Sequence, residues 1–119
     1  MKKLLLTFTF TLVLLGCSDV VENYYADYQQ AQADHLFERG WLPPILPAST
    51  TQIQVANNLD SNYSQGSFVI AEADLAQFIE QLEACEFSGL YRFQAEKSVW
   101  SFTLDTQGKV RYQLTSRAE

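Results

Sequence analysis

The chain has 119 residues, 47 % of them hydrophobic, and a net charge of −6, which suits one small domain with a modest core. This charge argues against a nucleic-acid partner, because neutralising phosphates requires clustered Lys and Arg. The charge is uneven: residues 17–90 contain eleven acidic side chains and one basic side chain, Arg39, whereas residues 91–119 carry five basic and three acidic ones. The acidic part is either a solvated surface or a surface for a cationic partner.

The N-terminal segment combines a basic start, an apolar run and a small residue before a cysteine. Lys2 and Lys3 follow the initial Met, residues 4–15 are apolar apart from three threonines, and the run ends in Leu14-Leu15-Gly16-Cys17. This pattern resembles the signal peptide of bacterial lipoproteins. The resemblance implies cleavage between Gly16 and Cys17 and acylation of Cys17, which would anchor the protein stably in a membrane.

The residues after Cys17 bear on the location of the anchor and on the alternatives. A membrane-spanning helix needs about 20 apolar residues, and the run up to Gly16 is shorter and is followed at once by Ser18 and Asp19. In enterobacterial lipoproteins an aspartate directly after the cysteine favours the inner membrane, and Ser18 stands there instead. The resemblance therefore implies the outer membrane, facing the periplasm. Removing residues 1–16 would leave residues 17–119 as a single domain and change the net charge from −6 to −8.

Residues 17–40 are expected to form an N-terminal amphipathic helix over residues 20–38, with Ser18 as N-cap and Gly40 after its end. At 100° per residue, one side of this helix gathers mainly aromatic and apolar residues: Val21, Tyr24, Tyr25, Tyr28, Ala31, His35 and Leu36. This tyrosine stripe would either pack on a sheet or contact lipid headgroups or a partner. The opposite side carries Asp27, Asp34 and Glu38, which we expect, with Trp41, to bind a partner.

Residues 41–50 contain all three prolines of the chain and are therefore expected to be an extended surface connection, neither helix nor central strand. Around it stand Arg39-Gly40-Trp41-Leu42-Pro43, Leu46-Pro47, Ile53 and Leu59-Asp60-Ser61-Asn62. Over residues 39–70 this pattern resembles small envelope lipoproteins labelled YbbD-like. The resemblance implies the class of protein, and it brings no assigned biochemical activity with it.

After Pro47 the hydrophobic period becomes that of strands and then that of a helix. Residues 51–56 and 67–71 are expected to pair as a hairpin around a polar loop, residues 57–66. Asp74 and Gln77 resemble a capping box that starts a second helix ending near Ala84. Its apolar side carries Leu75, Phe78, Ile79, Leu82 and Cys85. Cys85 has no partner in the chain if Cys17 is acylated, so it is expected to be a buried hydrophobe, with an intermolecular disulfide or a reactive thiol as alternatives.

Residues 90–94, 98–104 and 109–115 are expected to form a three-stranded meander. In its last turn, Gly108 stands where a three-residue hairpin loop needs a left-handed residue. The resulting register pairs Leu104 with Val110, Phe102 with Tyr112 and Trp100 with Leu114 on one face, and Thr103 with Arg111 and Ser101 with Gln113 on the other. We therefore predict an α+β fold of order α-β-β-α-β-β-β, in which the second helix packs on the apolar face of a small antiparallel sheet.

The sequence predicts no metal, no cofactor and no catalytic residue. Asp34, His35 and Glu38 would converge poorly on one ion, because a helix places His35 about 100° from Asp34. The segment from Asp60 to Ser64 has oxygen-bearing side chains at alternate positions, as at the start of a calcium loop. The sixth position of such a loop needs glycine and the twelfth needs glutamate, but this chain has Gln65 and Ala71 there. An Asx turn is the better interpretation.

Two functional hypotheses remain from the sequence. The favoured one is a non-enzymatic lipid-anchored envelope lipoprotein that acts as a small binding or structural module. Lipidated Cys17 would anchor it in the membrane, and its partner would be an envelope protein. The alternative is a lipid-anchored hydrolase that uses paired carboxylates, either Asp27 with Asp34 or Asp60 with Glu72.

Overall fold

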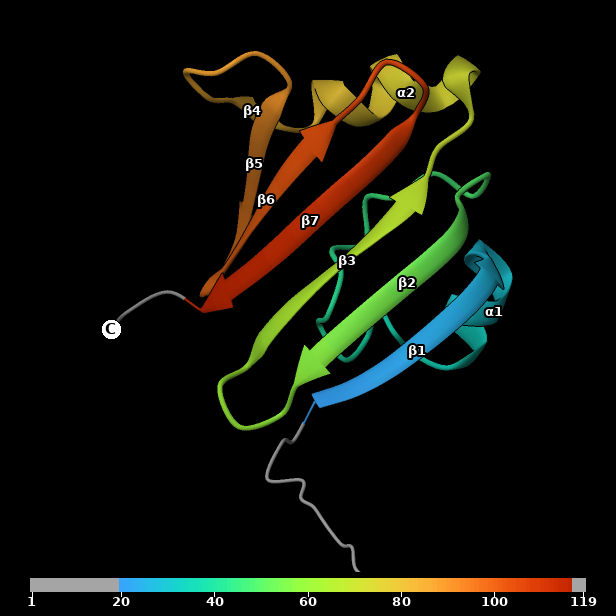
Figure 1. Cartoon of the computed structure of the whole chain (residues 1–119), viewed down its shortest axis with the longest axis vertical. Coiled ribbons are helices and arrows are strands. Elements are labelled where there is room, and N and C mark those ends of the chain that lie inside the picture. Colours follow the sequence, from blue (N-terminus) through green and yellow to red (C-terminus); the bar gives the residue numbers. More distant parts are fainter. Residues whose placement is uncertain (1–19, 117–119) are drawn as a thin grey trace, which may run out of the picture.

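In the computed structural model, which describes residues 20–116, a seven-stranded sheet has both helices on one of its faces (Figure 1). Every strand pairing is antiparallel, and the strand order is β1-β2-β3-β7-β6-β5-β4. In chain order the elements are β1 (Val20–Asp27), α1 (Tyr28–Ala33), β2 (Thr51–Asn58), β3 (Tyr63–Val69), α2 (Glu72–Glu80), β4 (Glu83–Ala84), β5 (Leu90–Ala95), β6 (Ser98–Leu104) and β7 (Lys109–Ser116).

The hairpin of β6 and β7 confirms the predicted register. Leu104 pairs with Val110, Phe102 with Tyr112 and Trp100 with Leu114. Asp105 fixes the turn, because its Oδ1 accepts hydrogen bonds from the backbone N–H groups of Gln107 and Lys109 at 2.8 and 3.0 Å. Gly108 has a φ of 88°, the left-handed conformation that this loop requires.

The hairpin of β2 and β3 confirms the predicted pairing, although both strands are longer than expected and the loop between them is shorter. An Asx turn closes this loop: Oδ1 of Asn58 accepts from the backbone N–H groups of Asp60 and Ser61 at 3.0 and 3.2 Å. Near the other end of β2, the register shifts between Thr51 and Gln54.

The predicted N-terminal helix over residues 20–38 is wrong, because residues 20–27 form strand β1. The β-branched and aromatic residues of this segment suit a strand, and pairing with β2 buries Tyr25, whose neighbour Tyr24 remains 58 % exposed. The tyrosine stripe is therefore split between the two faces of the sheet. Only the six residues of α1 are helical, and Asp27 caps them in place of Ser18 by accepting from the backbone N–H of Gln30 at 3.0 Å.

The second helix is confirmed in kind but not in its ends. It begins after Ala71, which has no polar side chain to cap it, so Asp74 is its third residue and not its N-cap. The Asp74 carboxylate accepts from the Ser49 hydroxyl at 2.6 Å. It ends at Glu80, and Cys85 lies half-buried beyond β4 rather than on the helix. The observed order is thus β-α-β-β-α-β-β-β-β. The coarser description, a small antiparallel sheet with helices on one face, agrees with the prediction.

The core lies between the sheet and the layer formed by α1, α2 and residues 41–50. Phe78 of α2 packs edge to face against Phe68 and Phe102, with ring centroids 6.1 and 5.5 Å away. The Pro-rich connection is free of helix and strand, as predicted, but it does not run only over the surface. Its Leu42 and Leu46 are 0 % and 5 % exposed, so this connection contributes buried side chains to the same core as α2.

Candidate functional site

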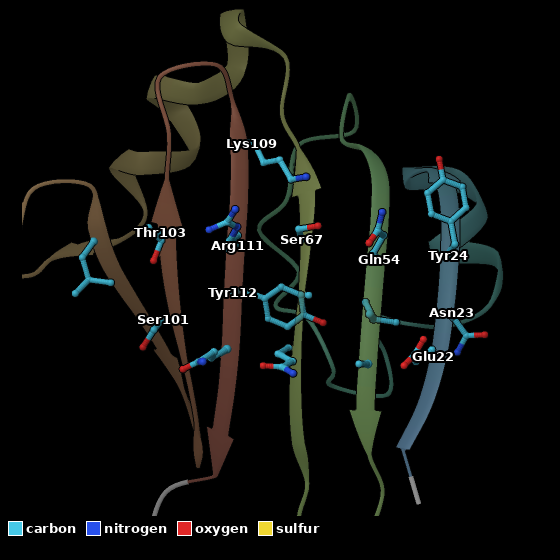
Figure 2. Close-up of a pocket in the computed structure, with 16 residues that line it drawn as sticks. Glu22, Asn23, Tyr24, Gln54, Ser67, Ser101, Thr103, Lys109, Arg111 and Tyr112 are labelled. Carbon is cyan, nitrogen blue, oxygen red and sulfur yellow. The ribbon is translucent and has the colours of Figure 1, made fainter. Parts of the chain in front are cut away.

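The face of the sheet opposite the helices is open and mostly polar among the described residues (Figure 2). Strand alternation directs every second side chain to this face, which we call the open face. Across five strands it presents Glu22 and Tyr24 of β1, Gln54 of β2, Gln65 and Ser67 of β3, Lys109, Arg111 and Gln113 of β7, and Ser101 and Thr103 of β6.

The open face is hollowed, and the hollow has a volume of about 1100 Å³. Gly66 of β3 lies in its floor between Val55 and Tyr112. A Cβ atom at this position would stand 1.9 Å from the carbonyl oxygen of Gln54, so only glycine allows this close approach of β2 and β3.

Two cations line the hollow, Arg111 near its middle and Lys109 toward the end of β3 (Figure 2). Lys109 and Arg111 extend from β7, the fourth of the seven strands, and neither forms an ion pair within residues 20–116. Arg92, also on this side of the sheet, differs because Glu83 pairs with it at 2.7 Å. Glu22 is the one acidic residue that lines the hollow, and it lies three strands away from β7, about 14 Å at the usual strand spacing. The centre of the open face is therefore cationic in a chain that is acidic overall.

Asp105 lies in the turn of the same hairpin. Backbone N–H groups of Gln107 and Lys109 lower the pKa of its carboxyl, and the positive charges of Lys109 and Arg111 lower this pKa further. Its hydrogen bonds to the backbone commit this carboxylate to the turn. The guanidinium of Arg111 remains available to an external anion.

This arrangement can bind a ligand through charge and hydrogen bonds. An Arg guanidinium binds carboxylate or phosphate with two parallel hydrogen bonds, and Lys adds a second positive charge. The amides of Gln54, Gln65 and Gln113 can both donate and accept. The hydroxyls of the hollow have no histidine beside them, since the single histidine, His35, contacts Glu38 in the turn after α1.

The acidic residues expected to bind a partner do not share a helix face. Asp27 is the N-cap of α1, and Asp34 follows the end of α1, where its Oδ2 accepts from the Tyr25 hydroxyl at 2.6 Å and from Arg39 at 3.2 Å. Burial, and then this hydrogen bond to Asp34, raises the pKa of Tyr25. Glu38 is exposed beside His35. Asp27 and Asp34 thus have structural roles. The one contact described for the Glu38 side chain is with His35.

Trp41, the fourth residue expected to bind a partner, packs against the core. Its side chain is half-buried, and its carbonyl oxygen accepts the indole N–H of Trp100 at 3.0 Å. Gly16 and Cys17, the expected cleavage and lipidation site, lie outside the described residues.

The structure separates one of the two carboxylate pairs of the hydrolase hypothesis, Asp60 with Glu72. Asp60 lies in the turn before β3 and Glu72 begins α2 after it, so the seven residues of β3, about 23 Å, separate the two. Paired carboxylates of glycosidases stand about 5–9.5 Å apart. Asp27 and Asp34 flank the two ends of α1 and take the hydrogen bonds described above. Within residues 20–116, no three His, Cys, Asp or Glu residues gather as metal ligands would.

Sequence reasoning found only part of the open face. The alternation in the last hairpin placed Ser101, Thr103, Arg111 and Gln113 on its wet side, and the structure confirms this. The half that β1, β2 and β3 contribute was missed, because β1 was taken for a helix and the pairing of β3 with β7 joins segments about 45 residues apart.

The fold defines a class: a two-layer α+β protein whose antiparallel sheet has one covered and one open polar face. Residues 19–69 match the family model described as the YbbD head domain. This match supports the resemblance to YbbD-like proteins and spans β1, α1, β2 and β3, ending at the last residue of β3. No curated protein and no solved structure matches the chain significantly. Neither helix within residues 20–116 has the length and hydrophobicity to cross a bilayer.

Proposed function

We propose that this protein is a non-enzymatic, lipid-anchored envelope lipoprotein, and that it acts as a small binding module through its open face. Support for the anchor comes from the Leu14-Leu15-Gly16-Cys17 pattern. Support for binding comes from Arg111, an exposed guanidinium without an ion-pair partner among residues 20–116, at the centre of a hollow about 1100 Å³ in volume.

The ligand class follows from the charge of the hollow. Lys109 and Arg111 are two residues apart on one strand, so their side chains extend in the same direction and their charges add. Neutral amides and hydroxyls surround them, and no acidic side chain of the neighbouring strands β3 and β6 lines the hollow. An envelope partner that presents a carboxylate or phosphate group to β7 is the ligand that this surface favours.

The anchor is tested by replacing Cys17 with serine. The serine hydroxyl cannot form the thioether that commits a lipoprotein to acylation, so the Cys17→Ser protein should stay unprocessed or lack acyl chains. Metabolic labelling with a fatty-acid analogue measures this directly. Label that persists in the Cys17→Ser protein would overturn the proposed anchor.

The binding surface is tested by affinity capture from envelope extracts with the lipidated protein as bait. Replacing both Lys109 and Arg111 with Gln should greatly reduce the amount of captured partner and slow its association. Raised salt should weaken capture by the wild type, because at physiological salt exposed charges interact strongly only within about 8 Å. Arg92→Gln is the matched control, because Arg92 lies on the same side of the sheet but is already paired with Glu83. Equal losses in the control and the double variant would argue against a specific site at β7.

A cationic partner at the acidic residues is the competing outcome. Glu38→Gln tests it cleanly, whereas changes at Asp27 and Asp34 would also disturb the cap of α1 and the bonds to Tyr25 and Arg39. Capture that falls with Glu38→Gln and is unchanged by the β7 variant would move the binding surface to the turn after α1.

A further inference from the structure

One end of the sheet carries most of the exposed large hydrophobic side chains. Val20 and Val21, at the start of β1, are 41 % and 43 % exposed, and Leu59, in the turn between β2 and β3, is 55 % exposed. Val20 pairs with Asn58, the neighbour of Leu59, so the three residues lie at the same end of the sheet (Figure 1). We call these three residues the apolar tip.

The apolar tip is the part of the described structure that the chain connects to Cys17. Three peptide units separate the Cα atoms of Cys17 and Val20, which limits their distance to about 11 Å. β1 then continues away from this end for eight residues, about 27 Å. An acyl chain on Cys17 would therefore hold the apolar tip close to the bilayer, while the opposite end of the sheet would lie a strand length further out.

We propose that the apolar tip inserts into the headgroup region of the membrane and orients the sheet upright on it, an inference that rests on the proposed lipid anchor at Cys17. Burial in a lipid interface removes Val20, Val21 and Leu59 from water. Tyr63 is half-buried at the start of β3 beside this tip, and its hydroxyl donates to the side-chain oxygen of Gln65 at 3.2 Å. A tyrosine with an apolar ring and a polar end suits the membrane boundary.

A bilayer fits the apolar tip better than a protein partner does. Stable protein interfaces use about 20–30 residues on each side, whereas the tip offers three apolar side chains. The upright orientation also serves the open face. Lys109 pairs with Val69 at the far end of β3, so the cationic part of the hollow stays away from the lipid and accessible from the side.

The test uses the lipidated full-length protein in vesicles of phosphatidylcholine and phosphatidylethanolamine, since Glu22 and Asp60 beside the tip disfavour anionic lipid. A nitroxide is attached at Leu59→Cys in a Cys85→Ser background. The matched control is Gln107→Cys, which is exposed in the turn between β6 and β7 at the opposite end of the sheet. At position 59 the spin label should collide several-fold more often with oxygen and less often with a water-soluble nickel complex than the label at 107.

A second measurement avoids the change at Leu59 itself. Hydrogen exchange of the backbone amides of residues 59–62 in the unlabelled lipidated protein should slow several-fold when vesicles are present, while residues 105–108 should exchange at an unchanged rate.

The outcomes separate the tip from the anchor. Equal water exposure of both labels in a protein that co-sediments with vesicles would overturn the inserted tip and leave the anchor intact. A protein with intact Cys17 that carries no acyl chain would overturn both. Shielding of position 59 that is already complete without vesicles would assign the tip to contact between copies of the chain and would also overturn insertion.

Discussion

Replacing Phe78 by alanine should detach α2 from the sheet. Phe78 is the one buried residue of this helix and is 0 % exposed. Its ring stands nearly perpendicular to those of Phe68 and Phe102, at 89° and 81°, with centroids 6.1 and 5.5 Å away. Leu75 of α2 packs against the same core but is only half-buried, so the substitution removes the most deeply buried contact between α2 and the core.

The expected cost follows from the burial of this ring. A fully buried Phe replaced by alanine loses about 3–5 kcal/mol of unfolding free energy, through lost transfer energy and the cavity that remains. Each edge-to-face aromatic pair contributes about 0.5–1.5 kcal/mol, and Phe78 makes two such pairs, which places it in the upper part of that range. The free energy of unfolding of such domains is about 5–15 kcal/mol, so the variant should lose a large part of its stability.

Urea titration of the soluble form, residues 18–119, measures this loss, with the fluorescence of Trp41 and Trp100 as probe. Phe87→Ala is the matched control, because Phe87 is 71 % exposed and should change the unfolding free energy by no more than about 0.5 kcal/mol. A loss below about 1 kcal/mol for Phe78→Ala, or equal losses at both positions, would refute the placement of α2 on the core.

Four further variants test the sheet. Gly66→Ala should destabilise the protein by at least about 1–3 kcal/mol in the same titration, because the new Cβ would meet the Gln54 carbonyl oxygen at 1.9 Å; an unchanged midpoint would contradict this close approach. Ser64→Ala should cost about 1–3 kcal/mol, since the buried Ser64 hydroxyl donates to Asn57 and contacts the Tyr112 hydroxyl, whose pKa is raised by burial. Tyr112→Phe should cost less, because Ser64 keeps its bond to Asn57. Asp105→Asn should make the stability of the protein depend less on pH in acid. The Asp105 carboxyl has a lower pKa in the folded state than in the unfolded state, so its ionised form stabilises the fold above the unfolded pKa. This contribution is lost as the pH falls through the folded pKa. Parallel curves of stability against pH for this variant and the wild type would remove Asp105 from the acid response.

The sequence alone determined the last hairpin and the location of one helix. The turn from Asp105 to Gly108 sets the register of the hairpin between Trp100 and Leu114. Strict alternation assigns Trp100 and Phe102 to one face and Ser101 and Thr103 to the other. Phe78 was placed in the core by helical spacing alone. Each of these inferences depends on neighbours in the chain, which is why local rules were sufficient.

The tertiary structure decided the first half of the molecule. Residues 20–27 suggested a helical period, but pairing with the edge of β2, some thirty residues further along the chain, makes them a strand. That choice moved Tyr24 to the open face, made Asp27 a helix cap and turned Asp34 toward Tyr25. It also completed the hollow around Arg111, a surface that exists because the pairing of β3 with β7 joins two hairpins that are separate in sequence. Such pairings depend on the packing of the whole sheet, which local periodicity does not contain.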